Sequence, residues 1–348
     1  MLVTGVTQRE AWRAKTAPPV EQVRPGLWSV PVPIPDSPLR YTLSYLFAGD
    51  AGVVVVDPGW DSAAGRAAVA TGLARAGAGV NDVIGVVVTH IHPDHHGLSG
   101  WLREAAGAWV AMHPAERDTL PARAWAGAAA AGADRDWLRE QGVPEAELPA
   151  LVVDLDPASP LLAMAEPDRL VEDGDLLPVP GRQVRAVWTP GHTPGHLCLH
   201  DPAAGVLLTG DHLLPRISPN IGLHAAREGD PLTAYLHSLR RMADYADSEA
   251  LPAHEYRFRH LDARAAYLIG HHRDRCAEII TALDDLGAAT CWQIAPRLTW
   301  SRGWAALGGM MRRMALAETA AHLRHLQTAG TLGRDNGSPT LWRHHEPD

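Results

Sequence analysis

Apolar runs alternate with polar breaks through the first ninety residues and predict a series of strands. GLWSVPV (26–32) and TLSYLFA (42–48) read as β-strands, and GVVVVDPG (52–59) has the continuous apolar pattern of a buried strand that ends in turn residues. The alanine-rich segment 62–77 has helical character, and VIGVVV (83–88) reads as another buried strand. The order strand, helix, strand predicts an open α/β sheet.

The middle of the chain breaks this pattern and then resumes it. Residues 114–168 contain alanine- and proline-rich helical pieces, which predict an insertion that serves as a lid or pocket wall. QVRAVW (183–188), HLCLH (196–200) and VLLTG (206–210) predict a second sheet. Asp230 and Pro231 are typical of a helix start. The apolar positions that follow fall on one helical face: Leu232, Leu236, Leu239 and Met242.

The chain changes character after about residue 272. The order there is helix, helix, helix and a terminal hairpin, which is the pattern of a small winged-helix domain. We therefore predict two domains, a catalytic domain at 24–260 with the helical insertion and a C-terminal domain at 273–345.

Composition restricts the classes of protein to consider. With 348 residues, 46% apolar and 20% charged residues and a formal net charge of −9, the chain reads as globular and offers no overall basic footprint for nucleic acid. No apolar segment approaches the roughly 20 residues of a membrane helix, and the start of the chain lacks a signal-peptide pattern, so we expect no membrane association and a cytoplasmic location. The three cysteines are too few and too widely spaced for a disulfide framework.

The stretch THIHPDHHG (89–97) concentrates metal ligands directly after a predicted buried strand. His90, His92 and Asp94 follow at spacings of two, and His95 comes next. If the strand continues, this spacing sends the two imidazoles to the same side, and the turn at Pro93 lets the next two side chains reach a neighbouring point. One short segment can therefore serve two metal ions.

Two metal ions need further ligands, and three other segments supply them. TPGHTPGH (189–196), TGD (209–211) and LPAHE (251–255) each follow an apolar or strand-like run. Open α/β sheets keep their ligands at the carboxyl ends of strands, so these segments are placed where such a site requires them. A single histidine beside a strand is more often a core or surface residue, and only the agreement of residue type, order and context carries the interpretation.

This motif set resembles that of the metallo-β-lactamase superfamily over roughly residues 24–260. The resemblance implies an α/β fold of the αββα sandwich type. It also implies that the first metal binds His90, His92 and His192, that the second binds Asp94, His95 and His254, and that Asp211 bridges them. Because these ligands include no thiolate, Zn²⁺ is the leading candidate for the two divalent ions, and Fe or Mn stays open.

Other residues near these motifs are weaker candidates. We expect His196 to orient the GHTPGH turn as a supporting group. Arg216 and Asn220 follow the bridging carboxylate on a predicted loop and are candidate substrate-binding residues, as is Tyr41 on an early strand. Core packing or a surface ion pair would explain Tyr41 and Arg216 equally well.

The resemblance implies a hydrolase in which a hydroxide shared by the metals attacks the substrate and Asp94 transfers the proton. The GHTPGH motif is shared closely with thioester-cleaving members of the glyoxalase II type, so an ester, thioester or lactone of a small molecule is the favoured substrate. Asp211 replaces the cysteine ligand of some β-lactam-cleaving members, and His92 replaces a glutamate of the electron-transferring diiron members, which disfavours both activities.

The tail resembles the winged-helix domain of some hydrolases of this superfamily, a few of which are ribonucleases. A phosphodiesterase acting on nucleic acid is therefore the alternative function, and a non-catalytic binding protein is a third. Residues 271–348 contain nine arginines and eight acidic residues, a net charge of +1, so nucleic-acid binding is not favoured. A packing role or a homodimer contact is the better expectation for the tail.

Overall fold

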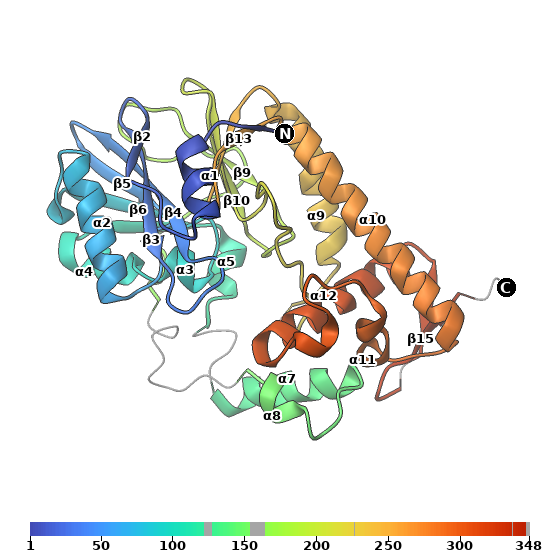
Figure 1. Ribbon diagram of the computed structural model, residues 1–348. Coiled ribbons are helices and arrows are strands. Elements are labelled where there is room, and N and C mark those ends of the chain that lie inside the picture. Colours follow the sequence, from blue (N-terminus) through green and yellow to red (C-terminus); the bar gives the residue numbers. More distant parts are fainter. Residues whose placement is uncertain (122–126, 154–163, 226, 336, 346–348) are drawn as a thin grey trace. The chain divides into compact units, whose positions relative to one another are not determined.

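A computed structural model describes residues 1–121, 127–153, 164–225, 227–335 and 337–345 (Figure 1). The chain divides into two compact units, each made of separated segments. Unit 1 comprises Met1–Arg123, Ala158–Pro219 and Ser238–Ala265, and unit 2 comprises Ala124–Pro157, Asn220–His237 and Ala266–Asp348.

Unit 1 contains two β-sheets. The seven-stranded sheet has the order β2 (Glu21–Arg24), β3 (Leu27–Pro33), β4 (Tyr41–Gly49), β5 (Gly52–Val56), β6 (Val83–Val87), β7 (Trp109–Met112) and β8 (Arg169–Leu170). The six-stranded sheet has the order β1 (Leu2–Val3), β13 (Phe258–Arg259), β12 (Glu249–Pro252), β11 (Val206–Gly210), β10 (Leu197–Asp201) and β9 (Arg185–Trp188). Parallel pairs occur in both sheets. They are β5 with β6, β6 with β7 and β7 with β8 in the first and β11 with β12 in the second.

Strand β5 shows why the first half of the chain reads as continuous apolar runs. Val54 and Val56 belong to a buried cluster shared with Leu199 and Leu208 of the other sheet. The alternating residues of β5, Val53 and Val55, belong to a second cluster with residues of helices α2 (Ala63–Arg75) and α4 (Ser99–Ala106). Figure 1 shows both helices beside the sheet that contains β5. A strand that is buried on both faces has no solvent-facing positions, so its sequence does not alternate between apolar and polar residues.

The other described helices occur throughout the chain. In order they are α1 (Val6–Arg13), α3 (Pro93–His96), α5 (Pro114–Asp118), α7 (Gly127–Glu140), α8 (Leu148–Leu151), α9 (Pro231–Arg240), α10 (Leu261–Leu286), α11 (Cys291–Ile294) and α12 (Gly309–Thr328), with 3₁₀ turns at Val80–Asp82, Arg241–Tyr245, Ala295–Arg297 and Trp304–Ala306. Among the described residues, none of the helices has the length and apolar composition that a membrane span requires.

Unit 2 has its own apolar core, which joins α7, α8, α11 and α12 with the hairpin β14 (Leu332–Arg334) and β15 (Trp342–His344). A buried ion pair fastens the 124–157 segment to α12: Arg313 donates to both carboxylate oxygens of Asp134, at 2.5 and 3.0 Å. Asp134 also accepts the backbone N–H of Val153 at 2.9 Å. Such a pair is costly to break from one side only, so it fixes the register of the two segments.

The mixed α/β fold predicted from the strand and helix pattern is confirmed. The described segments between 114 and 151 include helices, as expected, and the insertion itself stays a prediction. The expected order of three helices and a hairpin at the C-terminus is also observed, while the winged-helix assignment stays a prediction, as do the domain limits 24–260 and 273–345. Helix α1 was not predicted. Part of the predicted insertion, residues 122–126 and 154–163, lies outside the described residues.

Candidate metal centre

The candidate ligands gather beyond the carboxyl ends of strands from both sheets. His90 and His92 lie in the loop after β6, and His192 lies in the loop between β9 and β10. Asp211 directly follows β11, and His254 comes two residues after β12. The sequence interpretation placed these side chains at strand ends, and the structure places them there.

The local reason for the His90–His92 arrangement differs from the one expected. Strand β6 ends at Val87, so alternation along a strand does not aim the two imidazoles. His92 is instead the extended residue before the one-turn helix α3, whose first residue is Pro93. The fixed backbone angle of Pro93 starts this helix directly, and the turn carries Asp94 and His95 past the loop.

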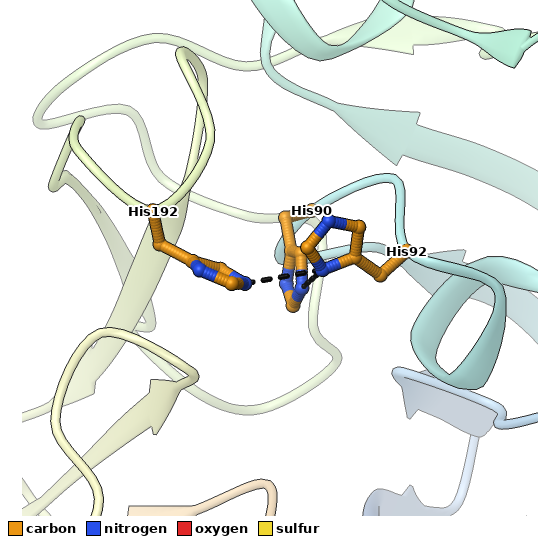
Figure 2. A group of neighbouring side chains, drawn as sticks. All are labelled: His90, His92 and His192. Carbon is orange, nitrogen blue, oxygen red and sulfur yellow. Dashed lines mark hydrogen bonds between the residues drawn. The ribbon is translucent and has the colours of Figure 1, made fainter. Parts of the chain in front are cut away.

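Three histidines converge on one point and form what we call the tri-histidine cluster, His90, His92 and His192 (Figure 2). The Nδ1 atom of His92 lies 2.9 Å from Nε2 of His90 and 3.1 Å from Nε2 of His192. Ligand atoms at about 2.1 Å from one tetrahedral ion are about 3.4 Å apart. The observed separations are slightly shorter than this, so the three nitrogens would need to move apart only a little to bind one ion.

A second group, the Asp-His-His cluster, consists of Asp94, His95 and His254. Oδ2 of Asp94 lies 3.7 Å from Nε2 of His95 and 3.4 Å from Nε2 of His254. These separations match the spacing expected around one tetrahedral ion. Both imidazoles are fully buried, and the Asp94 side chain is 16% exposed.

Asp211 reaches both clusters with different oxygens. Its Oδ1 lies 3.2 Å from Nε2 of His254 and 3.6 Å from Nε2 of His95, whereas its Oδ2 lies 3.7 Å from Nε2 of His192. A carboxylate in this position can bridge two cations.

The site passes a direct test of whether metal ions fit. Three of its atoms, Nε2 of His95, Nε2 of His254 and Oδ1 of Asp211, are buried and contact only one another and Asp94, with no further hydrogen-bond partner among the described residues. Buried polar atoms are normally satisfied, because leaving one unpaired costs about 1–3 kcal/mol. All three face the same point, where a cation would satisfy them together.

The outer nitrogens of these imidazoles are held by supporting groups that the sequence did not reveal. Asp57, directly after β5, accepts the N–H and the hydroxyl of Thr89 at 2.8 and 2.7 Å and lies 2.9 Å from Nδ1 of His95. The Thr89 hydroxyl lies 3.0 Å from Nδ1 of His90. One buried carboxylate therefore orients a histidine of each cluster.

His196 contacts the backbone of Asp211. Its Nε2 accepts the backbone N–H of Asp211 at 3.1 Å, and its Nδ1 lies 2.8 Å from the hydroxyl of Thr189. Gly210 makes this close approach possible, because a Cβ there would come within 2.6 Å of the same Nε2, and its backbone has a positive φ of 48°. The role as a supporting group expected for His196 agrees with this position.

Glu116 ties the two histidine-bearing loops together. This fully buried residue of α5 accepts the N–H of Ile91 on one oxygen at 2.8 Å and the N–H of Gly195 on the other at 2.6 Å. The first loop carries His90 and His92, and the second carries His192. Sequence reasoning missed Glu116, since one acidic residue in a helical segment carries no pattern of its own.

Burial and neighbouring charges shift the histidine pKa values of the two clusters in opposite directions. Burial lowers the pKa of His90 well below its ordinary value, with like-charged histidines acting in the same direction. Burial alone would also lower the pKa of His254, but the carboxylates of Asp211 and Asp94 outweigh it and raise the pKa to about 10. The same carboxylates raise the pKa of His95 despite its burial. Burial opposes ionisation of Asp94 and Asp211 as well, yet the neighbouring histidines lower both pKa values.

The candidate substrate residues are spread over both units. The guanidinium of Arg216 is exposed and lies 5.9 Å from the ring centre of Trp12 in unit 1. Tyr41 is buried, its hydroxyl donates to the Glu255 carbonyl at 3.3 Å, and its own carbonyl lies 3.0 Å from Nδ1 of His254. Asn220 belongs to unit 2, where its amide donates to the Met314 carbonyl and to Glu318. A substrate contact stays a prediction for all three.

Comparison with known proteins identifies the family. A family model described as the metallo-beta-lactamase superfamily matches residues 37–254. The structure of a metallo-beta-lactamase family protein from Thermus thermophilus is 33% identical, with a TM-score of 0.77 over 93% of this chain and 100% of that chain. A beta-lactamase domain protein from Burkholderia ambifaria is 30% identical, with a TM-score of 0.78 over 93% and 94% of the two chains.

Curated relatives match over a shorter part of the chain. A lactamase-like protein of Penicillium aethiopicum is 36% identical over 115 residues, and a hydroxyacylglutathione hydrolase of Maricaulis maris is 38% identical over 87 residues. The matches cover 33% and 25% of this chain and about a third of each relative, 35% and 32%. The chain belongs to the metallo-β-lactamase superfamily, whose members are generally hydrolases that bind divalent metals, and the resemblance read from the motifs is thereby confirmed.

Proposed function

We propose that this chain is a dinuclear metal-dependent hydrolase that cleaves the ester, thioester or lactone bond of a small molecule. One observation carries the proposal: the Asp211 carboxylate stands between two three-residue clusters, with one oxygen toward each. Two ions that share this carboxylate would lie close enough to act on a single substrate group.

The residues present fit a pair of borderline divalent cations. His90, His92 and His192 would hold the first ion, Asp94, His95 and His254 would hold the second, and Asp211 would contact both. Imidazole and carboxylate ligands in near-tetrahedral spacing suit Zn²⁺, with Fe or Mn as alternatives that the same donors accept. The chemistry that such a pair supplies is a hydroxide nucleophile at neutral pH and polarisation of the scissile carbonyl group.

The protein's own residues would position the reactants and move the proton. Asp94 is the more exposed of the two carboxylates, 16% against 11% for Asp211, so it can accept a hydrogen bond from the attacking water and then deliver the proton to the leaving atom. His95 and His254 keep their geometry because Asp57 and the Tyr41 carbonyl hold their outer nitrogens. Glu116 fixes the loops that carry the tri-histidine cluster, which keeps the opposite side of the site rigid.

A thioester is the substrate class with the most support. The Maricaulis maris relative is named for the hydrolysis of a hydroxyacylglutathione, which is a thioester, and its match includes 38% identity over 87 residues. The chain also has the GHTPGH motif that suggested this class from the sequence. This similarity covers only part of either protein, so the acyl group and the leaving thiol are left to experiment.

Purified protein with its metal content measured should be tested against an acylglutathione thioester, an acyl-coenzyme A thioester, an aromatic lactone, a β-lactam and bis(p-nitrophenyl) phosphate. We expect hydrolysis of a thioester, an ester or a lactone at a rate that tracks bound metal and is lost in His92→Ala. Hydrolysis of the phosphodiester alone would instead favour the nuclease alternative, and hydrolysis of the β-lactam alone would make the chain a β-lactamase.

A further inference from the structure

Unit 2 contains a cavity of about 350 Å³ that none of the candidate metal ligands lines. Its wall combines residues of the 124–157 segment, the 220–237 segment, helix α12 and the terminal hairpin, and all of them belong to this one unit. The volume lies at the lower end of the range typical of small-molecule sites, roughly 300–1,000 Å³.

The chemistry of the wall changes with depth. The most buried lining residues are apolar or hydrogen-bonding: Gln141, Leu223, Ala320, Thr340 and Trp342. The half-buried charges are both arginines, Arg227 and Arg324, whereas the exposed rim mixes Glu140, Glu228 and Arg334. Acidic groups are thus limited to the solvent edge, and the interior of the cavity is positive.

Two residues of the wall have a buried donor atom without an acceptor. Nε of Arg324 and the indole Nε1 of Trp342 are buried and have no hydrogen-bond partner among the described residues, and Trp342 is only 4% exposed. Arg324 also has no carboxylate at ion-pair distance in the described part of the chain. Helix α12 opens the space around it, because Ala320 lies one turn before Arg324 on the same face.

We infer that this cavity is a second ligand site, for a small molecule that has an anionic group on a flat, apolar body. A carboxylate or phosphate would pair with the Arg324 guanidinium and accept the indole N–H, which satisfies both orphaned donors. The rings of Trp137 and Trp342 would contact the flat part of the ligand. The site is independent of the proposed hydrolysis, since no residue of the metal centre takes part.

Isothermal titration calorimetry on the metal-loaded full chain tests this inference. The probes are 1-naphthoate for a carboxylate on a flat body, adenosine 5′-monophosphate for a phosphate on one, and 1-naphthalenemethanol as the neutral match. We expect one anionic probe to bind with a Kd below about 1 mM and the neutral probe to bind at least about tenfold more weakly.

Substitutions of cavity residues test whether the anionic probes bind in this cavity. Arg324→Met should weaken the anionic probe about tenfold or more, and Trp342→Phe, which keeps the ring but removes the donor, about threefold to tenfold. Arg273→Met, on an arginine that is 80% exposed, is the matched control and should leave the Kd unchanged. Arg324→Met changes a half-buried side chain, so it keeps the test valid if Trp342→Phe, a change in the core of unit 2, does not fold.

Three results would overturn the inference. They are the absence of binding by either anionic probe, equal Kd values in wild type and both cavity variants, and binding that Asp211→Asn abolishes while Arg324→Met leaves it intact. The last result would place the anion at the metal centre. A preference for the carboxylate or the phosphate probe would show which anionic group the cavity takes.

Discussion

The two ligand clusters of this protein are built from similar side chains but respond to protons in opposite ways. The tri-histidine cluster contains imidazoles only, and burial keeps the pKa of His90 low. The Asp-His-His cluster sits against two carboxylates, which raise the pKa of His254 to about 10. Without metal, the second cluster is therefore held by charged pairs between protonated histidines and carboxylates, whereas the first is held by hydrogen bonds among its imidazoles.

If both clusters hold metal ions as we propose, this difference gives the two positions different tasks. His90 at neutral pH is already in the form that binds a cation, so the tri-histidine cluster is preorganised for its ion. At the other cluster, an ion must displace at least one proton, and that cluster also contains the partly exposed Asp94 that we propose for proton transfer. We expect the first position to be filled more tightly and the second to be the more responsive to conditions.

The largest expected effect comes from Asp94→Asn. Because Asp94 is both a ligand of the second cluster and the proposed proton carrier, kcat/KM should fall on the order of a thousandfold, and bound metal should fall from two ions toward one. Metal analysis and steady-state kinetics on the same sample measure both. Asp118→Asn, an exposed carboxylate outside the site, serves as the control. Loss of both ions would show that the clusters are not separable in this way.

The second-largest expected effect is a difference between the two clusters in how their metal affinity depends on pH. His254 has its pKa raised from 6.5 to about 10, so it is protonated at neutral pH and must lose that proton to bind a metal. The apparent affinity of the Asp-His-His cluster should rise about tenfold per pH unit for each proton displaced, or about a hundredfold between pH 6 and 8 for one proton, and level off near pH 10.

The pKa of His90 lies below 6.5, so above that pH this residue gives the tri-histidine cluster no such dependence. Calorimetric titrations in two buffers of different ionisation enthalpy would count the protons released at each step. Equal proton release at both steps would remove the distinction between the clusters.

Asp57→Asn should affect the second cluster more than the first. The Asp57 carboxylate contacts His95 directly but reaches His90 only through Thr89. Changes in such supporting residues typically weaken metal affinity 10–100-fold, and we expect that loss at the Asp-His-His cluster. Thr89→Val is the complementary variant and should weaken the tri-histidine cluster instead. Competition with a chelator resolves the two affinities, and a reversed order would contradict this assignment.

Glu116→Gln should give the smallest effect of the four. Gln offers one acceptor oxygen where Glu116 offers two, so either Ile91 or Gly195 loses its acceptor. A buried N–H left unpaired costs about 1–3 kcal/mol, which should appear as a lower melting temperature and a loss of roughly tenfold in affinity at the tri-histidine cluster. Glu104→Gln, on an exposed residue of α4, is the control. No change in either quantity would remove Glu116 from the site.

The sequence predicted the parts of the site that are written as local patterns. His90, His92, Asp94 and His95 occur in one segment after an apolar run, and the other candidate ligands each follow a strand, so order and context were sufficient. Asp57, Thr89 and Glu116 were missed because each is a single polar residue whose role depends on a distant partner. A signal for Asp57 was present: it follows the buried GVVVV run at a strand end, as the ligands do.

The fold, too, was predictable where it follows from a local sequence pattern and not where it depends on contacts between distant segments. Runs such as 52–56 are apolar on both faces and show a buried strand directly, whereas helix α1 has only one fully buried residue, Gln8, and gave no clear apolar stripe. Unit 2 draws together 124–157, 220–237 and 266–348, which no periodicity links. Its assembly depends on long-range contacts such as the one between Arg313 and Asp134.

The metal content of wild type and Asp211→Ala, measured after dialysis against metal-free buffer, tests the central claim most directly. The claim that one carboxylate serves two ions predicts about two ions per chain in the wild type and a loss at both positions in the variant, to less than one ion per chain. Two ions retained by Asp211→Ala, or a wild type that never holds more than one, would contradict it.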